Sequence, residues 1–388
     1  MNLPKITSAM LVLTHKCNLR CRYCFVEKKP EIMSYQVALD AVKFLIANAE
    51  EDGSTPSINF FGGEPMLEWD NIIVPLTNYI RQEYGKPFSI GITSNGTLLT
   101  QERLDFMKKN NFGFLLSCDG GKETQDYNRP YASGKGSFEE VSKWFRSLLD
   151  WIPGMTFRMT SIPATCNNLM NNILFASETG FINCFTIPNI FEKWDTDARE
   201  QMKKQLELYS DYYIDCYRRF TRPIVLNPLE ECFGEIIRIN RATAKRNYRT
   251  DSKCSAMGKC GLGANRYGAI HPNGDIYGCQ EMTSNDESSQ IFKIGNIYSG
   301  VDDSKRFALI NLFDSKSIHM KECSDCLYNN ICDGDCVANN YLLNGDVNKV
   351  SEIMCWWKRL LLENAIKIMT VLGDENNEMF AKTWKKVI

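Results

Sequence analysis

The chain has 388 residues, of which 44% are hydrophobic and 24% are charged, and its formal net charge is −2. This length suits two domains better than one, because single hydrophobic cores stop growing near the upper end of ordinary domain size. The charge is close to zero and the Lys and Arg residues form no run, so there is no electrostatic case for nucleic acid as a partner.

Sixteen cysteines would suggest disulfides in a secreted chain, but the first residues lack the charged, apolar and small-residue regions of a signal peptide. No apolar run is long enough to span a membrane, since Leu360–Leu372 is interrupted by Glu363, Asn364 and Lys367. We therefore expect a reducing, cytoplasmic setting without a membrane partner. Clustered cysteines then indicate metal binding.

The first cluster is Cys17, Cys21 and Cys24, spaced C-x3-C-x2-C directly after the apolar run Ala9–Leu13. A four-iron cluster is normally held by four cysteines, so a compact triplet would leave one iron open for another ligand. Read alone, the triplet also fits a zinc site completed by a distant ligand. Buried thiols acting as small hydrophobic side chains are a further alternative.

Short apolar or alternating segments, expected to be strands, alternate with amphipathic segments of helical length, which is typical of parallel βα units. Six such units would build an α/β fold, an incomplete TIM-like (β/α)6 barrel with its functional groups at the C-terminal ends of the strands. The expected strands are Met10–Leu13, Ser57–Phe61, Ser89–Thr93, Phe114–Cys118, Thr156–Ile162 and Cys184–Pro188. The expected helices are Tyr35–Ala49, Trp69–Tyr84, Gln101–Asn110, Ser137–Trp151 and Leu169–Thr179.

Small and polar residues follow three of these strands. Gly62, Gly63, Glu64 and Pro65 follow the second, Ser94 and Asn95 the third, and Ser117 and Asp119 the fourth. Paired glycines let the backbone approach a ligand closely, and short polar side chains offer donors to an anionic group. Ordinary turn chemistry explains the same residues, so both interpretations stay open.

The cysteine triplet, combined with Phe60–Pro65, resembles the signature of radical S-adenosylmethionine (SAM) enzymes. In that family the open iron binds SAM, and an electron from the cluster cleaves SAM to a 5′-deoxyadenosyl radical that abstracts hydrogen. The resemblance makes Cys17, Cys21 and Cys24 the catalytic cluster ligands and places Tyr23 near the adenine. The other SAM contacts that it implies are Gly62, Gly63, Glu64, Pro65, Ser94, Asn95, Ser117 and Asp119.

Beyond the expected barrel, a helix over Asp195–Phe220 has Asp195 or Thr196 as its N-cap. We expect a barrel domain at 1–230, a bridging segment at 231–251 and a small cysteine-rich domain at 252–388. In the last of these, Gly268–Gly278 reads as a β-hairpin that holds Cys279. Ser351–Leu372 reads as a closing helix that carries Cys355.

From Cys260 onward, the C-terminal cysteines resemble the seven-cysteine SPASM pattern of radical SAM enzymes with two auxiliary iron–sulfur clusters. Cys254 makes eight, enough to ligate two [4Fe–4S] clusters, so three clusters and SAM are the expected cofactors. The spacing C-x2-C-x5-C-x3-C alone also fits a four-thiolate zinc site. Resemblance to sulfatase-maturing enzymes assigns one cluster to Cys254, Cys260, Cys279 and Cys336, and the other to Cys323, Cys326, Cys332 and Cys355.

Auxiliary clusters saturated by protein thiolates would serve in electron transfer, which indicates net oxidation. The resemblance implies a peptide or protein substrate. The hypothesis is therefore a maturase that forms a thioether or carbon–carbon cross-link in a ribosomally made precursor peptide. Because the expected barrel begins almost at Met1, we expect a separate leader-binding protein, or the barrel itself, to hold the leader. A flavodoxin or ferredoxin would supply electrons.

Sulfatase maturases place an acidic residue, the proposed base, directly after the hairpin cysteine. This chain has Gln280 there, followed by Glu281. An amide cannot serve as a base, which puts formylglycine formation in doubt but keeps it as an alternative. A redox-neutral peptide epimerase, a small-molecule SPASM enzyme and a non-enzymatic, zinc-stabilised binding protein are further alternatives.

Overall fold

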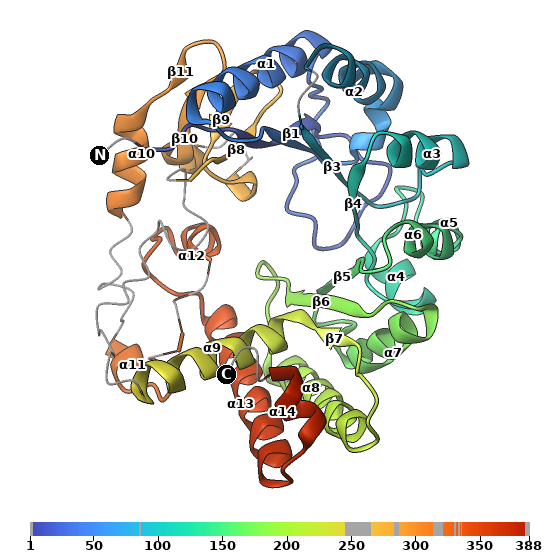
Figure 1. Ribbon diagram of the computed structural model, residues 1–388, viewed down its shortest axis with the longest axis vertical. Coiled ribbons are helices and arrows are strands. Elements are labelled where there is room, and N and C mark those ends of the chain that lie inside the picture. The colour runs from blue at the N-terminus through green and yellow to red at the C-terminus, as the bar shows by residue number, and fades with distance from the viewer. Residues whose placement is uncertain are drawn as a thin grey trace. The chain divides into compact units, whose positions relative to one another are not determined.

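The structure is a computed structural model that describes residues 3–84, 87–244, 265–282, 287–312, 321–329, 331–332, 334 and 336–384. The chain has an α/β fold and divides into two compact units, neither of them one continuous segment (Figure 1). The first unit comprises Met1–Ser117, Tyr131–Gly134 and Cys254–Ser315, and the second comprises Cys118–Pro130, Lys135–Lys253 and Lys316–Ile388.

The first unit is built on an eight-stranded sheet in the order β11-β10-β9-β8-β1-β2-β3-β4. The strands from β1 to β4 are parallel, and β8 adds a further parallel strand to the other side of β1. The remaining three pair antiparallel beyond β8. The bounds are β1 Ser8–Thr14, β2 Ser57–Gly62, β3 Ser89–Ser94, β4 Phe112–Leu116, β8 Tyr267–Ile270, β9 Asp275–Tyr277, β10 Lys293–Asn296 and β11 Gly300–Val301.

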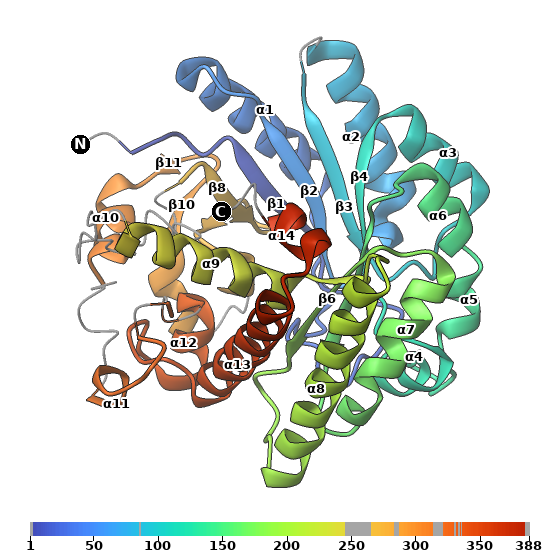
Figure 2. The same ribbon diagram turned by 60° about the horizontal axis from the view of Figure 1, so that its bottom comes forward.

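Helices α1, α2 and α3 lie along one face of the parallel strands, and α10 lies beside β10 (Figures 1 and 2). Ser34 caps α1 by accepting the Val37 N–H at 3.2 Å, and the helix stops at Gly53, whose φ of 65° suits glycine. The bounds are α1 Tyr35–Asp52, α2 Val74–Tyr79, α3 Gln101–Lys109 and α10 Asp303–Leu312, with 3₁₀ turns at Pro65–Glu68, Gln280–Met282 and Glu287–Phe292.

The helix expected over Trp69–Tyr84 is present, but only its middle is α-helical. Its two ends, Trp69–Ile73 and Ile80–Tyr84, have the wider π-helical hydrogen bonding. Pro75 is the second residue of the middle part, Val74–Tyr79, and proline has no N–H to donate to the preceding turn. The break in the bonding pattern at the first boundary therefore has a cause that was visible in the sequence.

The second unit holds a three-stranded parallel sheet, β5-β6-β7, and the long helices α8 and α13, which lie side by side (Figure 2). Between these helices, the buried Ser210 hydroxyl donates to Asn364 Oδ1 at 2.7 Å. The strands are β5 Thr156–Ser161, β6 Asn183–Pro188 and β7 Val225–Leu226. The helices are α4 Lys122–Asn128, α5 Phe138–Ser142, α6 Phe145–Trp151, α7 Leu169–Thr179, α8 Thr196–Arg218, α9 Asn227–Ala244, α11 Lys321–Ser324, α12 Val337–Asn344, α13 Glu352–Asp374 and α14 Glu378–Trp384, with a 3₁₀ turn at Cys166–Asn168.

Two expected elements differ from the structure in detail. The fourth strand lies two residues earlier than expected, so Ser117 stands just beyond its end rather than within it. The helix expected over Ser137–Trp151 is two helices, α5 and α6. The chain tightens between them, where the Trp144 N–H donates to the Val141 carbonyl at 3.1 Å in a 3₁₀-type bond.

Among the described residues, none of the helices combines the length and the apolar character needed to cross a membrane. The expected division into a barrel domain at 1–230, a bridging segment at 231–251 and a cysteine-rich domain at 252–388 is a division into continuous segments. The compact units are discontinuous and do not test it, so it stays a prediction.

Candidate metal centres

The cysteine triplet lies on a closed loop that leaves the C-terminal end of β1. The loop returns to β1 at an antiparallel bridge between Thr14 and Ile32, and the Met33 N–H donates to the Leu13 carbonyl at 2.7 Å. Leu19, in the middle of the loop, is buried and bridges to Tyr131 of the same unit. The three thiols are therefore held on a loop that is anchored at its base and in its middle.

Two of these thiols have an N–H or ammonium group beside their sulfur atom. The Cys17 thiol is half-buried, which raises its pKa, but its sulfur accepts the Leu19 N–H at 3.4 Å. The Lys28 ammonium lies 3.0 Å from the exposed Cys24 sulfur. Backbone N–H groups and ammonium groups stabilise the thiolate, which is the form that binds metal. The donor chemistry of the loop thus fits an iron–sulfur cluster.

Glu64 connects the segment after β2 to the segment after β3. Its side chain is 1% exposed, and burial raises its pKa. One carboxylate oxygen accepts the Ser94 hydroxyl at 2.9 Å and the Met66 N–H at 3.0 Å, and the other accepts the Asn95 N–H at 2.9 Å. The carboxylate therefore fixes the positions of Ser94 and Asn95, both of them expected SAM contacts.

Gly62 and Gly63 are required by close contact between backbones. A Cβ at Gly62 would stand 2.3 Å from the Thr14 carbonyl oxygen, and one at Gly63 would stand 2.1 Å from that of Lys16. The Gly63 N–H donates to Thr14, and the Glu64 N–H donates to Lys16, at 2.7 and 2.9 Å. Pro65 follows as the first residue of a 3₁₀ turn. The glycines thus bring the Glu64 segment against the start of the cysteine loop.

Asn18 and Thr97, which the sequence reasoning missed, complete a network around Asn95. The Asn95 amide donates to Asn18 at 3.0 Å, Asn18 donates to the Thr97 hydroxyl at 2.7 Å, and that hydroxyl donates to Asn95 at 2.6 Å. The Asn95 amide nitrogen also lies 3.9 Å from the Cys17 sulfur. Asn18 was visible inside the cysteine motif, but its partners follow β3 and could not be paired with it from spacing alone.

Two other predicted SAM contacts, Ser117 and Asp119, differ in how many hydrogen bonds they make within the protein. The Ser117 N–H donates to the Ser94 carbonyl at 3.0 Å, so Ser117 stands beside the Glu64 network. The buried Asp119 carboxylate accepts the Thr160 N–H and the Asn128 amide, at 3.0 and 3.1 Å, and lies 3.1 Å from the Arg129 guanidinium. These donors occupy most of its acceptor sites, which favours a structural role. Tyr23 is half-exposed.

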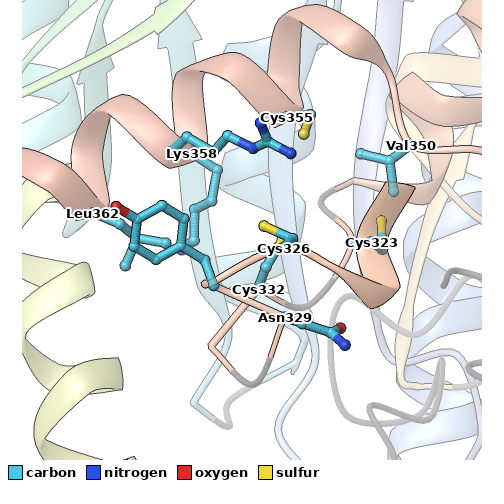
Figure 3. A pocket seen from close by; sticks show the side chains of 11 residues that line it. Cys323, Cys326, Asn329, Cys332, Val350, Cys355, Lys358 and Leu362 are labelled. Carbon is cyan, nitrogen blue, oxygen red and sulfur yellow. The ribbon is translucent and has the colours of Figure 1, made fainter. Parts of the chain in front are cut away.

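In the second unit, four predicted ligands line one cavity, shown in Figure 3. Three of them, Cys323, Cys326 and Cys332, come from α11 and the loop after it, and Cys355 comes from the first turn of α13. The described residues contain no group of three or more His, Cys, Asp or Glu side chains disposed around a single metal ion. Thiolates are the soft ligands that hold iron–sulfur clusters, and four thiols around a shared space fit such a group.

Asn340, another residue that sequence reasoning missed, holds this cavity together. Its side chain is fully buried, and its amide donates to the carbonyls of Gly334 and Val347 at 3.0 and 3.2 Å. Its oxygen accepts the N–H of Ser351, the N-cap of α13, at 3.1 Å. One side chain therefore joins the cysteine loop to the helix that carries Cys355.

The other predicted quartet is only partly described. Cys254 and Cys260 lie outside the described residues, Cys279 belongs to the first unit and Cys336 to the second. The hairpin predicted to hold Cys279 is confirmed as β8 and β9, joined by a turn in which Gly274 has a φ of 83°. Gln280 follows Cys279, and its side-chain oxygen accepts the Tyr267 hydroxyl.

Comparison with known proteins places these features in a family context. Residues 11–165 match the radical SAM superfamily. The radical SAM cyclopropyl synthase TigE of Paramaledivibacter caminithermalis is 23% identical over 384 residues, which cover 94% of this chain and 74% of that protein. A cysteine-type anaerobic sulfatase-maturating enzyme of Clostridium novyi is 32% identical over 132 residues, which cover 32% of this chain and 35% of that enzyme.

A likeness of fold extends over nearly the whole chain. The solved structure of native anSMEcpe with bound AdoMet and Cp18Cys peptide superposes with a TM-score of 0.72. The two proteins are 20% identical, and the match covers 95% of this chain and 99% of that one.

Proposed function

This chain carries a radical SAM domain, whose cofactors are a [4Fe–4S] cluster and SAM, and from that premise we propose that it is a peptide maturase. It abstracts hydrogen from one residue of a ribosomally made precursor peptide and oxidises it to a thioether or carbon–carbon cross-link. The same proposal includes the partial (β/α)6 barrel, the SPASM domain and three [4Fe–4S] clusters in all. The alternation of strands and helices along β1 to β6 supports the barrel.

The observation that carries this proposal is the cavity lined by Cys323, Cys326, Cys332 and Cys355. Four protein thiolates saturate the irons of a cubane. Substrate then cannot bind such a cluster directly, which favours electron transfer as its chemical role. An electron acceptor built into the chain favours net oxidation of the substrate over a redox-neutral change.

The first unit supplies the residues for the radical step. Cys17, Cys21 and Cys24 would hold three irons of the catalytic cluster, which supplies the 5′-deoxyadenosyl radical when SAM is bound. Glu64 would position Ser94 and Asn95, through the hydrogen bonds described above, as donors to the methionine part of SAM. Tyr23, Gly62, Gly63, Pro65 and Ser117 would shape the remainder of the SAM site. Asp119, which belongs to the second unit, would hold the turn after β4 through the hydrogen bonds described above.

The proposed cross-linking reaction removes two hydrogen atoms from the peptide. A carbon of the peptide loses a hydrogen atom to the radical, and the resulting carbon radical bonds to a thiol sulfur or another carbon. Closure of this bond releases one proton and one electron. Cys323, Cys326, Cys332 and Cys355 would hold the auxiliary cluster that could accept this electron. A flavodoxin or ferredoxin would supply the electron that initiates SAM cleavage.

The named relatives support a peptide substrate and bond formation. The solved structure of anSMEcpe holds a bound peptide. TigE is named a cyclopropyl synthase, and closing a cyclopropyl ring requires a new carbon–carbon bond. A separate leader-binding protein remains part of the proposal.

Formylglycine formation on a sulfatase is the second candidate, because a sulfatase-maturating enzyme is among the relatives. It is less favoured because Gln280 stands where the resemblance requires an acid, and its side-chain oxygen accepts the Tyr267 hydroxyl. An amide cannot take up the proton that this oxidation releases.

Mass spectrometry of a short peptide encoded beside this gene, after anaerobic co-expression, tests the proposal. We expect a peptide lighter by two hydrogen atoms and a fragmentation gap across the cross-linked residues. The matched control is the same co-expression with Cys17, Cys21 and Cys24 replaced by alanine. An unchanged mass with an inverted residue would indicate an epimerase. An aldehyde on a sulfatase peptide would indicate the second candidate, and a colourless, zinc-containing protein would indicate the binding protein.

A further inference from the structure

Helix α13 places two cationic side chains beside the cavity that the four thiols line. Cys355 lies in the first turn of this helix, and Lys358 and Arg359 follow three and four residues later, so all three share one side of it. Both cations line the same cavity as Cys323, Cys326 and Cys332. Figure 3 shows Cys355 on α13, on the side of the cavity opposite Cys323 of α11 and Cys326 of the loop after it.

The charge of Lys358 is compensated by a carboxylate. Its ammonium lies 2.7 Å from Glu235 Oε2 on α9, and both side chains are about one-fifth exposed. This ion pair has little net charge to offer the cavity.

The guanidinium of Arg359 stands close to the thiols, because Arg359 lines the cavity together with Cys355, Cys326 and Cys323. Guanidinium remains charged at every pH at which the protein is folded. Arg359 is exposed at the edge of the cavity, so solvent screens part of its effect.

An electron added to a cluster held by four thiolates increases its negative charge. A nearby cation stabilises that reduced form more than the oxidised form and therefore raises the reduction potential. Net charge, hydrogen bonds to sulfur and solvent exposure are the established means by which proteins set this potential.

We infer that Arg359 is a positioning residue for electron transfer, which raises the reduction potential of the cluster held by Cys323, Cys326, Cys332 and Cys355. This inference rests on the proposed function, in which that cluster accepts the electron released by the substrate. By raising this potential, the guanidinium makes electron transfer from the substrate to the cluster more favourable, and it does so without contacting the substrate.

Electron paramagnetic resonance during potentiometric titration of the iron-loaded, full-length protein tests this inference. The relevant signal is the one that Cys355→Ala removes or alters. In Arg359→Gln, we expect the equilibrium constant for reducing this cluster to fall about tenfold, a downward shift of about 59 mV for a one-electron couple. Arg359→Lys retains the charge and should stay close to the unmodified protein.

The matched control is Lys367→Gln, which removes one positive charge from the same helix at a side chain paired with Asp211. A shift in Arg359→Gln no larger than in this control would overturn the inference. Equal shifts in Arg359→Gln and Arg359→Lys would overturn it too, since hydrogen-bond geometry rather than charge would then be responsible.

The outcomes separate this inference from the proposed function. If Cys355→Ala leaves every cluster signal unchanged, the four thiols hold no cluster and the inference fails, whatever the peptide assay shows. If the potential shifts as expected but no peptide is cross-linked, Arg359 keeps its role while the substrate proposal fails.

Discussion

Glu64 is almost completely buried, yet three donors from two separate segments of the chain converge on its carboxylate. The Ser94 hydroxyl and the N–H groups of Met66 and Asn95 all donate to it. At the scale of single residues, this carboxylate joins the ends of β2 and β3 and so orders the candidate SAM site. Removing it would leave buried donors without partners, which costs about 1–3 kcal/mol for each group.

We expect Glu64→Ala to weaken SAM binding at least tenfold and to lower the free energy of unfolding by about 2 kcal/mol or more. Glu64→Gln should behave similarly, because its NH2 group would face an N–H donor. Isothermal titration with SAM and urea unfolding under anaerobic conditions measure the two effects. Glu102→Gln, at an exposed position in the first turn of α3, is the control. An affinity equal to that of the control would refute the positioning role.

The sequence indicated Glu64, Ser94 and Asn95 because each follows an expected strand. It could not indicate the bonds among them, since these depend on register between strands rather than on spacing. Gly62 and Gly63 illustrate the difference. From the sequence, these two glycines are expected to let the backbone approach a ligand. In the structure, their missing side chains also admit the carbonyls of Thr14 and Lys16, which the sequence could not indicate.

At the scale of elements, the spacing of apolar residues predicted the longer strands and helices well, because their buried faces follow that spacing. All six expected strands are present, α7 has the expected bounds, and α8 is capped by Asp195. The short elements around the C-terminal cysteines, α11 and α12 among them, were not predicted. They have too few residues to show a period, and a side chain such as Asn340 fixes them through contacts distant in sequence.

Helix α13 carries Cys355 one turn after its N-cap, Ser351, whose hydroxyl accepts the Met354 N–H at 3.4 Å. We expect Ser351→Ala to destabilise the protein by about 1 kcal/mol and to broaden the signal of the cluster that we propose Cys355 helps to hold. Ser34→Ala, at the N-cap of α1, should cost a similar amount. It should leave that signal unchanged, because α1 carries no cysteine. Urea unfolding and electron paramagnetic resonance distinguish the two variants, and identical spectra in both would contradict the prediction.

At the scale of the whole molecule, the cysteines predict a total iron content and the share of it that depends on Cys17, Cys21 and Cys24. The complete protein should bind about twelve irons, and the variant with Cys17, Cys21 and Cys24 replaced by alanine should keep about eight. That variant should form no 5′-deoxyadenosine, since it would lose the cluster proposed to cleave SAM. Iron analysis and chromatography of the nucleoside measure both. Cys216→Ala, on α8, is the control and should change neither; nucleoside formation by the triple variant would disprove the assignment.

The sheet of the first unit could be predicted only in part. The order of β1 to β4 follows from successive parallel units, but the pairing of β8 with β1 joins segments from opposite ends of the chain. Pro272, Asn273 and Gly274 indicate the hairpin in the sequence, but nothing there indicates that it pairs with β1. Two strands that pair across a long stretch of sequence leave no local pattern.

This pairing has a consequence for biosynthesis. The ribosome releases β1 long before β8 emerges, so throughout translation of the intervening segment one side of β1 has no strand to pair with. An apolar strand in that condition is a template for aggregation. Nascent chains should therefore depend on a chaperone until the hairpin docks, and products truncated before residue 265 should accumulate as inclusion bodies.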